Sequence, residues 1–405
     1  MTRRLLIHAT GAAHSGQLAT LGFALSNAGV RLLDINQSVT FGIVTLEVLV
    51  AVDDDTNSTG SLERALDEAR DRGGLDIQAI TVYDEDYVHW SQQAGTPRLI
   101  LTLLAPRLPA AVLAEVGRLS SAYGLVIERI HRLSGREALD GEAPSEGACV
   151  ECWLRGNVDI NGLRRAALAI GASHQVDIAI QEDSVWRRHR RLICFDMDAT
   201  LIKAEVIDEL ARRHGVYDEV SAITERAMRG ELDFRESFKL RMSKLKGLDE
   251  RVLKEVAASL PLMDGAERLL RQLKRLGYRT AILSGGFTYF AHELQRRLGV
   301  DEVHANTLEI DASGKATGNV VEPIVDADRK AYLLKQIAAR EGLALEQTIA
   351  VGDGANDLKM LATAGLGIAF RAKPKVRDQA RQSISILGLD AVLYLLGYRQ
   401  GDLIE

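Results

Sequence analysis

The sequence predicts an α/β protein in which a parallel sheet follows two small modules of mixed helix and strand. Between residues 3 and 180, strand and helix patterns run in the order βαββαβ and then repeat that order. From Leu192 onward, short apolar strands are separated by longer helices, which is typical of a parallel sheet covered on both faces.

The length of 405 residues exceeds one ordinary core, so we expect several domains. We place their boundaries at 1–93, 94–183 and 184–405. A net charge of −6, without basic runs that contain aromatic residues, argues against a nucleic-acid partner. No segment has the roughly 20 apolar residues of a membrane span, so we expect no membrane contact and a cytoplasmic location.

The first module has apolar side chains at helical spacing in its first helix, including Leu18, Leu21 and Leu25. Its second helix is polar and ends at Gly73-Gly74. The expected elements are a strand at Arg3–Thr10, a helix at Gly16–Ala28, strands at Val30–Thr40 and Gly42–Val52, a helix at Ser61–Arg72 and a strand at Leu75–Val82. This order is the ferredoxin-like arrangement.

The second module repeats the pattern more loosely, with a polar, glycine-rich loop at 134–147. The expected elements are strands at Arg98–Ala105, Gly124–Leu133, Cys149–Leu154 and His174–Ile180, and helices at Pro109–Ala122 and Asn161–Ile170. Cys149 and Cys152 are three positions apart on a strand and therefore point to opposite faces. We interpret them as two ordinary strand residues that share neither a metal nor a disulfide.

Polar residues follow three of the apolar strands in the third region, at the point where each strand ends. Asp196 and Asp198 follow Leu192–Phe195, and Ser284-Gly285 follows the strand at 280–283. Asp353 follows the strand at 348–351. Ligands of open α/β sheets bind at these carboxyl ends, and two carboxylates spaced by two residues point the same way if the chain stays extended. Carboxylate oxygens suit Mg²⁺.

A lysine, Lys330, lies near the start of a helix between the second and third of these strands, where it can reach a phosphate. Together the segments match DxDxT, a strand-ending serine, a lysine and GDxxxD. The region from Leu192 therefore resembles the haloacid dehalogenase-like superfamily, which implies a Rossmann-like parallel sheet. This resemblance implies that Asp196 is the nucleophile that forms an aspartyl phosphate, and that Asp198 is the acid and base. Mg²⁺ is held by Asp196, Asp353 and the carbonyl of Asp198.

The same resemblance implies roles for the remaining polar residues. Ser284, Gly285 and Lys330 hold the phosphoryl oxygens. Asp357 orients the groups that bind the metal, and Asn356 lies beside the reacting groups.

The resemblance narrows to the phosphoserine phosphatase family over nearly all of residues 190–395. That family inserts a helical cap, here expected at about 205–262. The family's Glu, Phe and Arg correspond to Glu205, Phe234 and Arg241. They imply that the substrate is O-phosphoserine, with Arg241 on its carboxylate, Glu205 on its ammonium group and Phe234 excluding water. Such an enzyme completes serine biosynthesis.

The two βαββαβ modules resemble ACT domains, which often bind amino acids. In the first copy we expect L-serine to contact Gly11, His14 and Gly16 before the first helix, and Asp34 and Asn36 on the second strand. The second copy lacks the glycines of the first loop, so we expect no ligand there. The alternative is that both modules only pair chains, and we expect a homodimer.

Two other functions remain open at this point. One is a phosphatase or phosphotransferase that acts on another small phosphomonoester or on a phosphoprotein. The other is an amino-acid sensor with an inactive catalytic domain. The intact residues Asp196, Asp198, Lys330 and Asp353 argue against the sensor.

Overall fold

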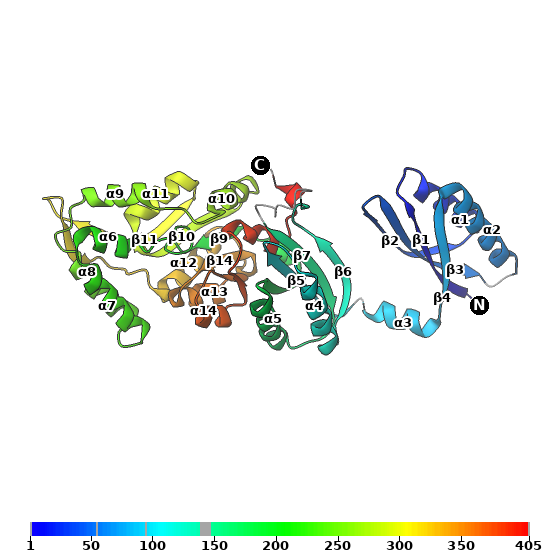
Figure 1. Ribbon diagram of the computed structural model, residues 1–405, viewed down its shortest axis with the longest axis horizontal. Coiled ribbons are helices and arrows are strands. Elements are labelled where there is room, and N and C mark those ends of the chain that lie inside the picture. The colour runs from blue at the N-terminus through cyan, green and yellow to red at the C-terminus, as the bar shows by residue number, and fades with distance from the viewer. Residues whose placement is uncertain (1, 54–55, 94, 138–146, 404–405) are drawn as a thin grey trace. The chain divides into compact units, whose positions relative to one another are not determined.

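The structure is a computed structural model that describes residues 2–53, 56–93, 95–137 and 147–403. The chain divides into two compact units, Met1–Thr96 and Pro97–Glu405, and each is described by itself (Figure 1). No helix among the described residues is both long and apolar enough to cross a membrane.

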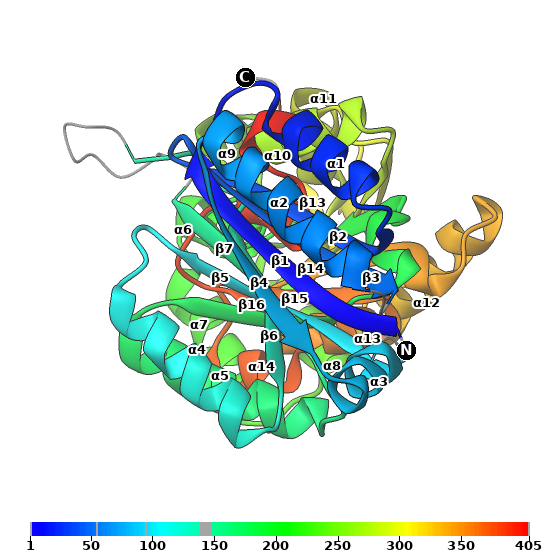
Figure 2. The same cartoon turned by 90° about the vertical axis from the view of Figure 1, so that its right-hand side faces the viewer.

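The first unit is a four-stranded antiparallel sheet in the order β2-β3-β1-β4. Its elements are β1 (Thr2–Ala12), α1 (Gln17–Asn27), β2 (Arg31–Thr40), β3 (Ile43–Asp53), α2 (Thr56–Gly73), β4 (Leu75–Val82) and α3 (Asp84–Gln93). Figure 2 shows α1 and α2 side by side across one face of this sheet. Alternate residues of β1, among them Ile7 and Ala9, are buried beneath the helices with Leu21 and Leu25. The predicted ferredoxin-like pattern is confirmed.

Helix α3 is absent from the sequence-based prediction. None of its residues is buried, so no apolar period marks it. Three acidic residues occupy its first turn, where the helix dipole favours negative charge.

The second module repeats the sheet order of the first, as β6-β7-β5-β8. Its elements are β5 (Arg98–Ala105), α4 (Ala110–Ala122), β6 (Val126–Arg132), β7 (Ala148–Arg155), α5 (Ile160–His174) and β8 (Asp177–Glu182). Cys149 and Cys152 are buried in two different apolar clusters on opposite faces of β7, as their spacing predicts. Much of the expected loop at 134–147 lies outside the described residues.

A six-stranded parallel sheet forms the centre of the second unit, in the order β11-β10-β9-β14-β15-β16. The strands are β9 (Leu192–Phe195), β10 (Arg279–Phe287), β11 (Glu302–Asn306), β14 (Thr348–Gly352), β15 (Leu366–Phe370) and β16 (Gln382–Ile384). In chain order this is 3-2-1-4-5-6, the doubly wound Rossmann arrangement. Its switch point lies between β9 and β14, where such folds bind ligands.

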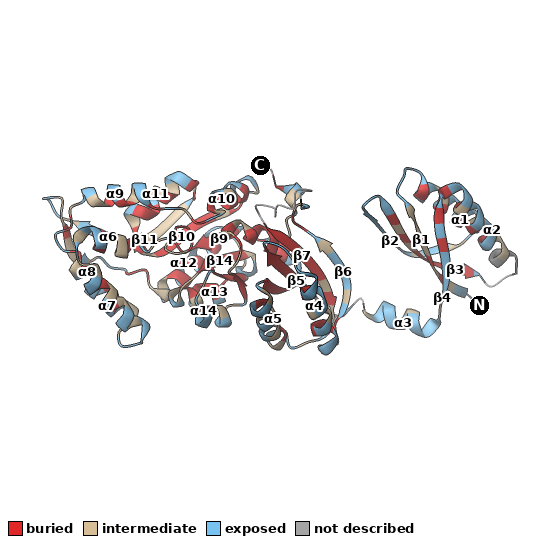
Figure 3. Ribbon diagram, in the orientation of Figure 1, coloured by how far each residue is buried: buried red, intermediate tan, exposed pale blue. Residues whose placement is uncertain are grey.

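Helices cover both faces of this sheet, and its inner strands β9, β14 and β15 are buried throughout, whereas the edge strand β11 is mostly half-buried (Figure 3). The helices outside the cap are α10 (Ala266–Arg275), α11 (Thr288–Leu298), α12 (Ala327–Arg340), α13 (Leu358–Thr363), α14 (Pro374–Gln379) and α15 (Val392–Leu395). Gly314 forms the turn of a hairpin between β12 (Leu308–Ile310) and β13 (Ala316–Val320).

A helical cap is inserted between β9 and α10, as the resemblance implied. Its helices are α6 (Val206–His214), α7 (Tyr217–Met228), α8 (Phe234–Lys244) and α9 (Arg251–Ser259). Apolar residues of the cap, such as Phe238 and Met242, belong to the same buried cluster as Phe195 and Phe287 of the sheet. The cap therefore packs directly over the carboxyl end of the central strands.

Candidate active site

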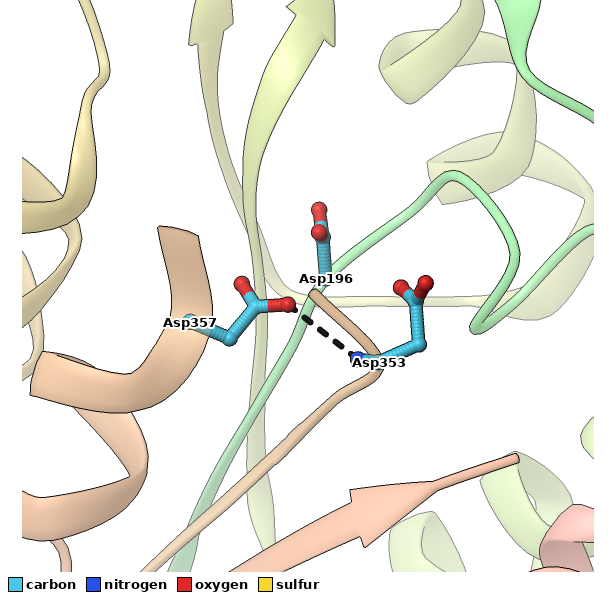
Figure 4. Close-up of side chains that lie close together, drawn as sticks. All are labelled: Asp196, Asp353 and Asp357. Atoms are coloured by element: carbon cyan, nitrogen blue, oxygen red, sulfur yellow. Dashed lines mark hydrogen bonds between the residues drawn. The ribbon is translucent and has the colours of Figure 1, made fainter. Parts of the chain in front are cut away.

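Three carboxylates converge at the switch point of the parallel sheet. Asp196 follows β9, and Asp353 and Asp357 follow β14. One oxygen from each lies within 4.8 Å of the others, and Figure 4 shows the three side chains around one small space. Because β9 and β14 are neighbouring parallel strands, residues far apart in the sequence meet at one edge of the sheet.

A buried lysine, Lys330, lies against two of these carboxylates. Its Nζ atom is 2.8 Å from Asp196 Oδ2 and 2.7 Å from Asp357 Oδ1. The Asp326 side chain caps the start of α12 by accepting a hydrogen bond from the Arg329 backbone, and this presents Lys330 on the first turn. Burial alone lowers the pKa of Lys330, but Asp196 and Asp357 outweigh that effect and raise it. Lys330 is therefore a fixed positive charge.

Both oxygens of Asp357 are engaged in hydrogen bonds. Oδ1 accepts from Lys330, and Oδ2 accepts from the backbone N–H groups of Asp353 and Gly354 at 3.1 and 2.9 Å. A side chain at Gly352 would collide with this carboxyl group, since its Cβ would lie 2.4 Å from Asp357 Cγ. These contacts hold the loop that carries Asp353 in place.

Asp353 also accepts a hydrogen bond from the Thr200 hydroxyl at 3.3 Å. Burial, followed by the charges of Asp196 and Glu205, raises the pKa of Asp353 to about 7. The charge of Lys330 acts in the opposite direction and favours the ionised form of Asp353. The site therefore holds several carboxylates against one lysine. A hard divalent cation coordinated by carboxylate oxygens fits this set of donors.

Asp198 reaches the site by a turn of the backbone. The strand ends at Phe195, and Ala199 has a left-handed φ of 52°, so the extended chain that we assumed after Asp196 is wrong. The turn lets Asp198 Oδ1 accept from the Val206 N–H at 3.3 Å. Burial, then the charges of Glu205 and Asp196, raises the pKa of Asp198 well above its ordinary value. A protonated Asp198 can donate a proton to a leaving group.

Ser284 and Gly285 follow the apolar part of β10 on the same edge of the sheet. The Ser284 hydroxyl accepts a hydrogen bond from the Gly286 N–H at 2.9 Å. Asn306 supports this turn, because its Nδ2 donates to the Gly285 carbonyl at 2.8 Å and its Oδ1 accepts from Val325 N–H at 2.7 Å. We missed Asn306 from the sequence, although it is a polar residue at a strand end like the others.

The cap places Phe234 directly against this turn. A Cβ atom on Gly285 would lie 3.1 Å from Phe234 Cζ, so residue 285 has no room for a larger side chain. The rings of Phe234 and Phe238 are parallel, with centroids 6.1 Å apart. Asp233 and Glu236 form a reciprocal capping box that fixes the start of α8 and hence the position of Phe234.

Arg241 and Glu205 lie on two cap helices that face the site. No ion pair involves Arg241 among the described residues, and its Nε atom is buried without a hydrogen-bond partner. Burial lowers the pKa of Arg241, and the charges of Glu205 and Asp208 oppose that shift. Glu205 keeps contact with solvent, and partial burial and the charges of Asp196 and Asp208 raise its pKa to about 7. We did not single out Asp208 from the sequence.

Asn356 is half-buried in the loop after β14 and is close enough to Gly354 that a Cβ there would lie 2.2 Å from its Oδ1. Asp196 itself is oriented by the Met197 N–H, which donates to its Oδ1 at 2.7 Å. The structure therefore brings the sequence-derived catalytic residues and the cap residues to one end of the sheet.

Comparisons with known proteins agree with this geometry. The haloacid dehalogenase-like hydrolase family matches residues 190–365, and the ACT domain matches residues 3–79. Phosphoserine phosphatase SerB2 of Mycobacterium tuberculosis is 40% identical over 402 residues, which cover 98% of this chain and 94% of that protein. The chain belongs to the phosphoserine phosphatase family.

One further relative and two solved structures are also similar to this chain. Phosphoserine phosphatase of Streptomyces coelicolor is 40% identical over 393 residues, 97% of this chain and 92% of its own. The crystal structure of a probable phosphoserine phosphatase from Vibrio cholerae covers 75% of this chain and 87% of that chain, with 35% identity and a TM-score of 0.59. A HAD family hydrolase from Salmonella enterica covers 74% of this chain and 98% of that chain, with 32% identity and a TM-score of 0.62.

The residues that we expected to bind an amino acid in the first unit form two separate groups. Gly11 packs against the Gly74 carbonyl, while His14 and Gly16 lie in the loop before α1. Asp34 is exposed on β2, where Asn36 donates to Glu47 at 3.2 Å. Among the described residues, no hydrogen bond or ion pair joins the two groups.

Proposed function

We propose that the protein is a magnesium-dependent phosphatase that hydrolyses O-phospho-L-serine through an aspartyl-phosphate intermediate. One observation carries the choice of substrate. Arg241 is a largely buried guanidinium group without a carboxylate partner among the described residues, and it shares the cap with Glu205 above Asp196. An amino acid with a phosphorylated side chain supplies the missing carboxylate, an ammonium group and the phosphoryl group.

The reaction has two steps that use the same pair of carboxylates. An Asp196 oxygen attacks phosphorus and forms a P–O bond, while the bond to the serine oxygen breaks. That oxygen takes the proton of Asp198, whose raised pKa keeps it protonated. A water molecule then attacks phosphorus and gives a proton to Asp198. The bond between phosphorus and the Asp196 oxygen breaks, so phosphate leaves and Asp196 is regenerated.

Other groups neutralise and position the phosphoryl oxygens. Lys330, the Ser284 hydroxyl and the Gly285 N–H hold them in the proposed complex. Mg²⁺, bound by Asp196, Asp353 and the Asp198 carbonyl, would supply further positive charge to these oxygens. Asp357 keeps the Asp353 loop in place, and Asn356 lies beside the reacting groups.

The cap discriminates between substrates. Arg241 binds the substrate carboxylate with two parallel hydrogen bonds, and Glu205 binds the ammonium group. Phe234 covers the phosphoryl site near Gly285 and excludes water.

The test is phosphate release from O-phosphoserine with and without Mg²⁺, in the wild type and in Asp196→Asn. We expect metal-dependent release that the substitution abolishes. Arg241→Ala should lose activity on phosphoserine far more than on p-nitrophenyl phosphate. Equal losses on the two substrates would argue for another phosphomonoester, and no release from any phosphomonoester would favour the sensor.

The modules supply regulation in this proposal. L-serine, the product, binds the first module near Gly11, His14, Gly16, Asp34 and Asn36. Each chain has three domains, at 1–93, 94–183 and 184–405, and two chains form a homodimer. The ACT match at residues 3–79 supports an amino-acid ligand. Calorimetry of the full chain with L-serine tests this, and the absence of heat at millimolar serine would contradict it.

A further inference from the structure

Two adjoining cavities lie where the second module packs against the edge of the parallel sheet. Their volumes are about 580 and 240 Å³. Helix α5 and strand β8 line them from the module, and α14 and β16 line them from the sheet side. Leu168, Ile178, Arg377 and Ser383 border both cavities, so the two form one continuous recess. The recess is built by elements other than those that carry the catalytic side chains.

Arginine side chains dominate the charge of this recess. Its lining contains Arg107, Arg164, Arg165, Arg377 and Arg381, against the acidic residues Asp177 and Asp378. Within the described ranges, only Arg165 of these five arginines makes an ion pair, with Asp159 at 4.0 Å. Such an excess of positive charge in a partly closed space favours an anion.

Arg377 lies at the boundary between the two cavities and carries the clearest sign of a missing partner. Its Nε atom is buried and has no hydrogen-bond partner among the described residues. An unpaired buried donor costs about 1–3 kcal/mol, and a charged one costs more. The neighbouring Asp177 does not satisfy it, since Asp177 Oδ2 accepts instead from the N–H groups of Ser385 and Ile386 at 2.7 and 2.9 Å.

Arg164 and Arg381 also make no ion pair among the described residues, and Glu182 is the acidic residue whose charge acts on Arg164. Arg164 donates through Nε and Nη2 to the Ile180 carbonyl at 3.2 and 3.1 Å, which holds it in the wall of the recess. Burial and then the charge of Arg381 lower the pKa of Arg164. An anion between these two guanidinium groups would relieve their repulsion.

The larger cavity adds an apolar wall. It consists of Pro106, Pro109, Leu168, Val176 and Ile386, together with Arg107 and His174 at its polar border. A ligand that fills both cavities therefore needs an anionic head for the arginines and an apolar body for this wall.

We propose that the recess between α5, β8, α14 and β16 is a binding site for a small organic anion that has a phosphate, sulfonate or carboxylate head and an apolar body. Its head contacts Arg377, Arg381 and Arg164, and its body lies between Pro106 and Ile386. Because both the module and β16 contribute to the site, the ligand ties the module to the edge of the catalytic sheet.

Calorimetry of the full-length protein with naphthalene-1-sulfonate tests the site, because this anion has both features and cannot be hydrolysed as a phosphomonoester. We expect one site per chain, with weaker binding of inorganic sulfate and of neutral 1-naphthol. The variant Arg377→Gln/Arg381→Gln should weaken binding by about tenfold or more, because two charge-assisted contacts are lost. Arg381→Gln alone, at an exposed position, should give a smaller loss and covers the case in which the double variant does not fold.

Two matched variants locate the probe. Arg118→Gln removes an exposed arginine of α4 outside the recess and should bind like the wild type. Arg241→Gln changes the catalytic site and should also keep its affinity. No binding at millimolar probe, unchanged affinity in both recess variants, or a loss confined to Arg241→Gln would overturn the proposal.

Discussion

The Nζ atom of Lys330 lies 2.8 Å from Oδ2 of Asp196, and both side chains are almost inaccessible to solvent. A buried ion pair contributes little when intact, but its rupture leaves an uncompensated charge in a medium of low polarity. In this site the same lysine also holds Asp357. Asp196, Lys330 and the loop after β14 are therefore one electrostatic unit.

Replacement of this lysine should affect both activity and stability. We expect Lys330→Met to lower phosphate release by about 10²–10³-fold, since a preorganised positive charge at the phosphoryl group is lost. The free energy of unfolding should fall by about 3–5 kcal/mol. Lys335→Met on the same helix is the control, because Lys335 is exposed and should tolerate the change. Full activity in Lys330→Met would contradict the proposed site.

Arg235 links the cap to the loop that precedes α12. Its Nε donates to Asp326 Oδ2 at 2.6 Å, and its Nη1 lies 3.8 Å from Glu322. We expect Arg235→Ala to raise KM for the phosphomonoester only modestly, by about two- to fivefold, since an exposed ion pair contributes little to the closed cap. Arg229→Ala is the control, because among the described residues Arg229 pairs within the cap alone, with Glu225 and Glu231. Steady-state kinetics measure both, and equal KM values would exclude a role in closure.

Gln382 joins the two sheets of the second unit through its side chain. Its Oε1 accepts from Ile180 N–H at 2.8 Å, and its Nε2 donates to the Ile180 carbonyl at 2.5 Å, all in a buried environment. Gln382→Leu leaves the Ile180 N–H without its side-chain acceptor, whereas the Ile180 carbonyl keeps its hydrogen bonds from Arg164. We therefore expect a loss of about 1–3 kcal/mol in urea unfolding. The exposed Gln379→Leu at the end of α14 should change stability little. A neutral Gln382→Leu variant would show that the two sheets do not depend on this contact.

Glu302 gives the stability a specific pH dependence. Its carboxylate accepts from Arg340 and lies 2.7 Å from His304 Nε2, and the hydrogen bond from Arg340, opposed in part by burial, lowers the pKa of Glu302 to about 2. A depressed carboxylate pKa means that its stabilisation is present above pH 4.5 and disappears as the pH falls toward 2.

We therefore expect Glu302→Gln to cost about 1–3 kcal/mol at pH 7 and clearly less at pH 3. Urea unfolding of both proteins at the two pH values measures this difference. Glu255→Gln, which removes an exposed partner of Arg213, should show little loss at either pH. A cost for Glu302→Gln that is the same at pH 3 and pH 7 would refute the linkage.

The sequence predicted the strands and helices of both modules, with ends within a few residues of those observed. Because these patterns depend on residues that are close together in the sequence, they can be recognised without knowledge of the fold. Helix α3 escaped prediction because it buries no residue and therefore has no apolar period. Asn306 was missed although it is a polar residue at a strand end, and Asp208 escaped because nothing adjacent to it in the chain marks its surroundings.

By itself, the sequence determined which strands end in polar residues and, through its resemblance to a known family, predicted which of those residues take part in chemistry. Only the tertiary structure decided that β9 and β14 are neighbours, which brings Thr200 within 3.3 Å of Asp353 across 153 positions of sequence. It also decided that Asp198 lies in a turn next to the left-handed residue Ala199, and that five arginines line one recess. The reason is physical: side-chain periodicity is local, whereas strand order, burial and the charges that surround a group arise from contacts between distant segments.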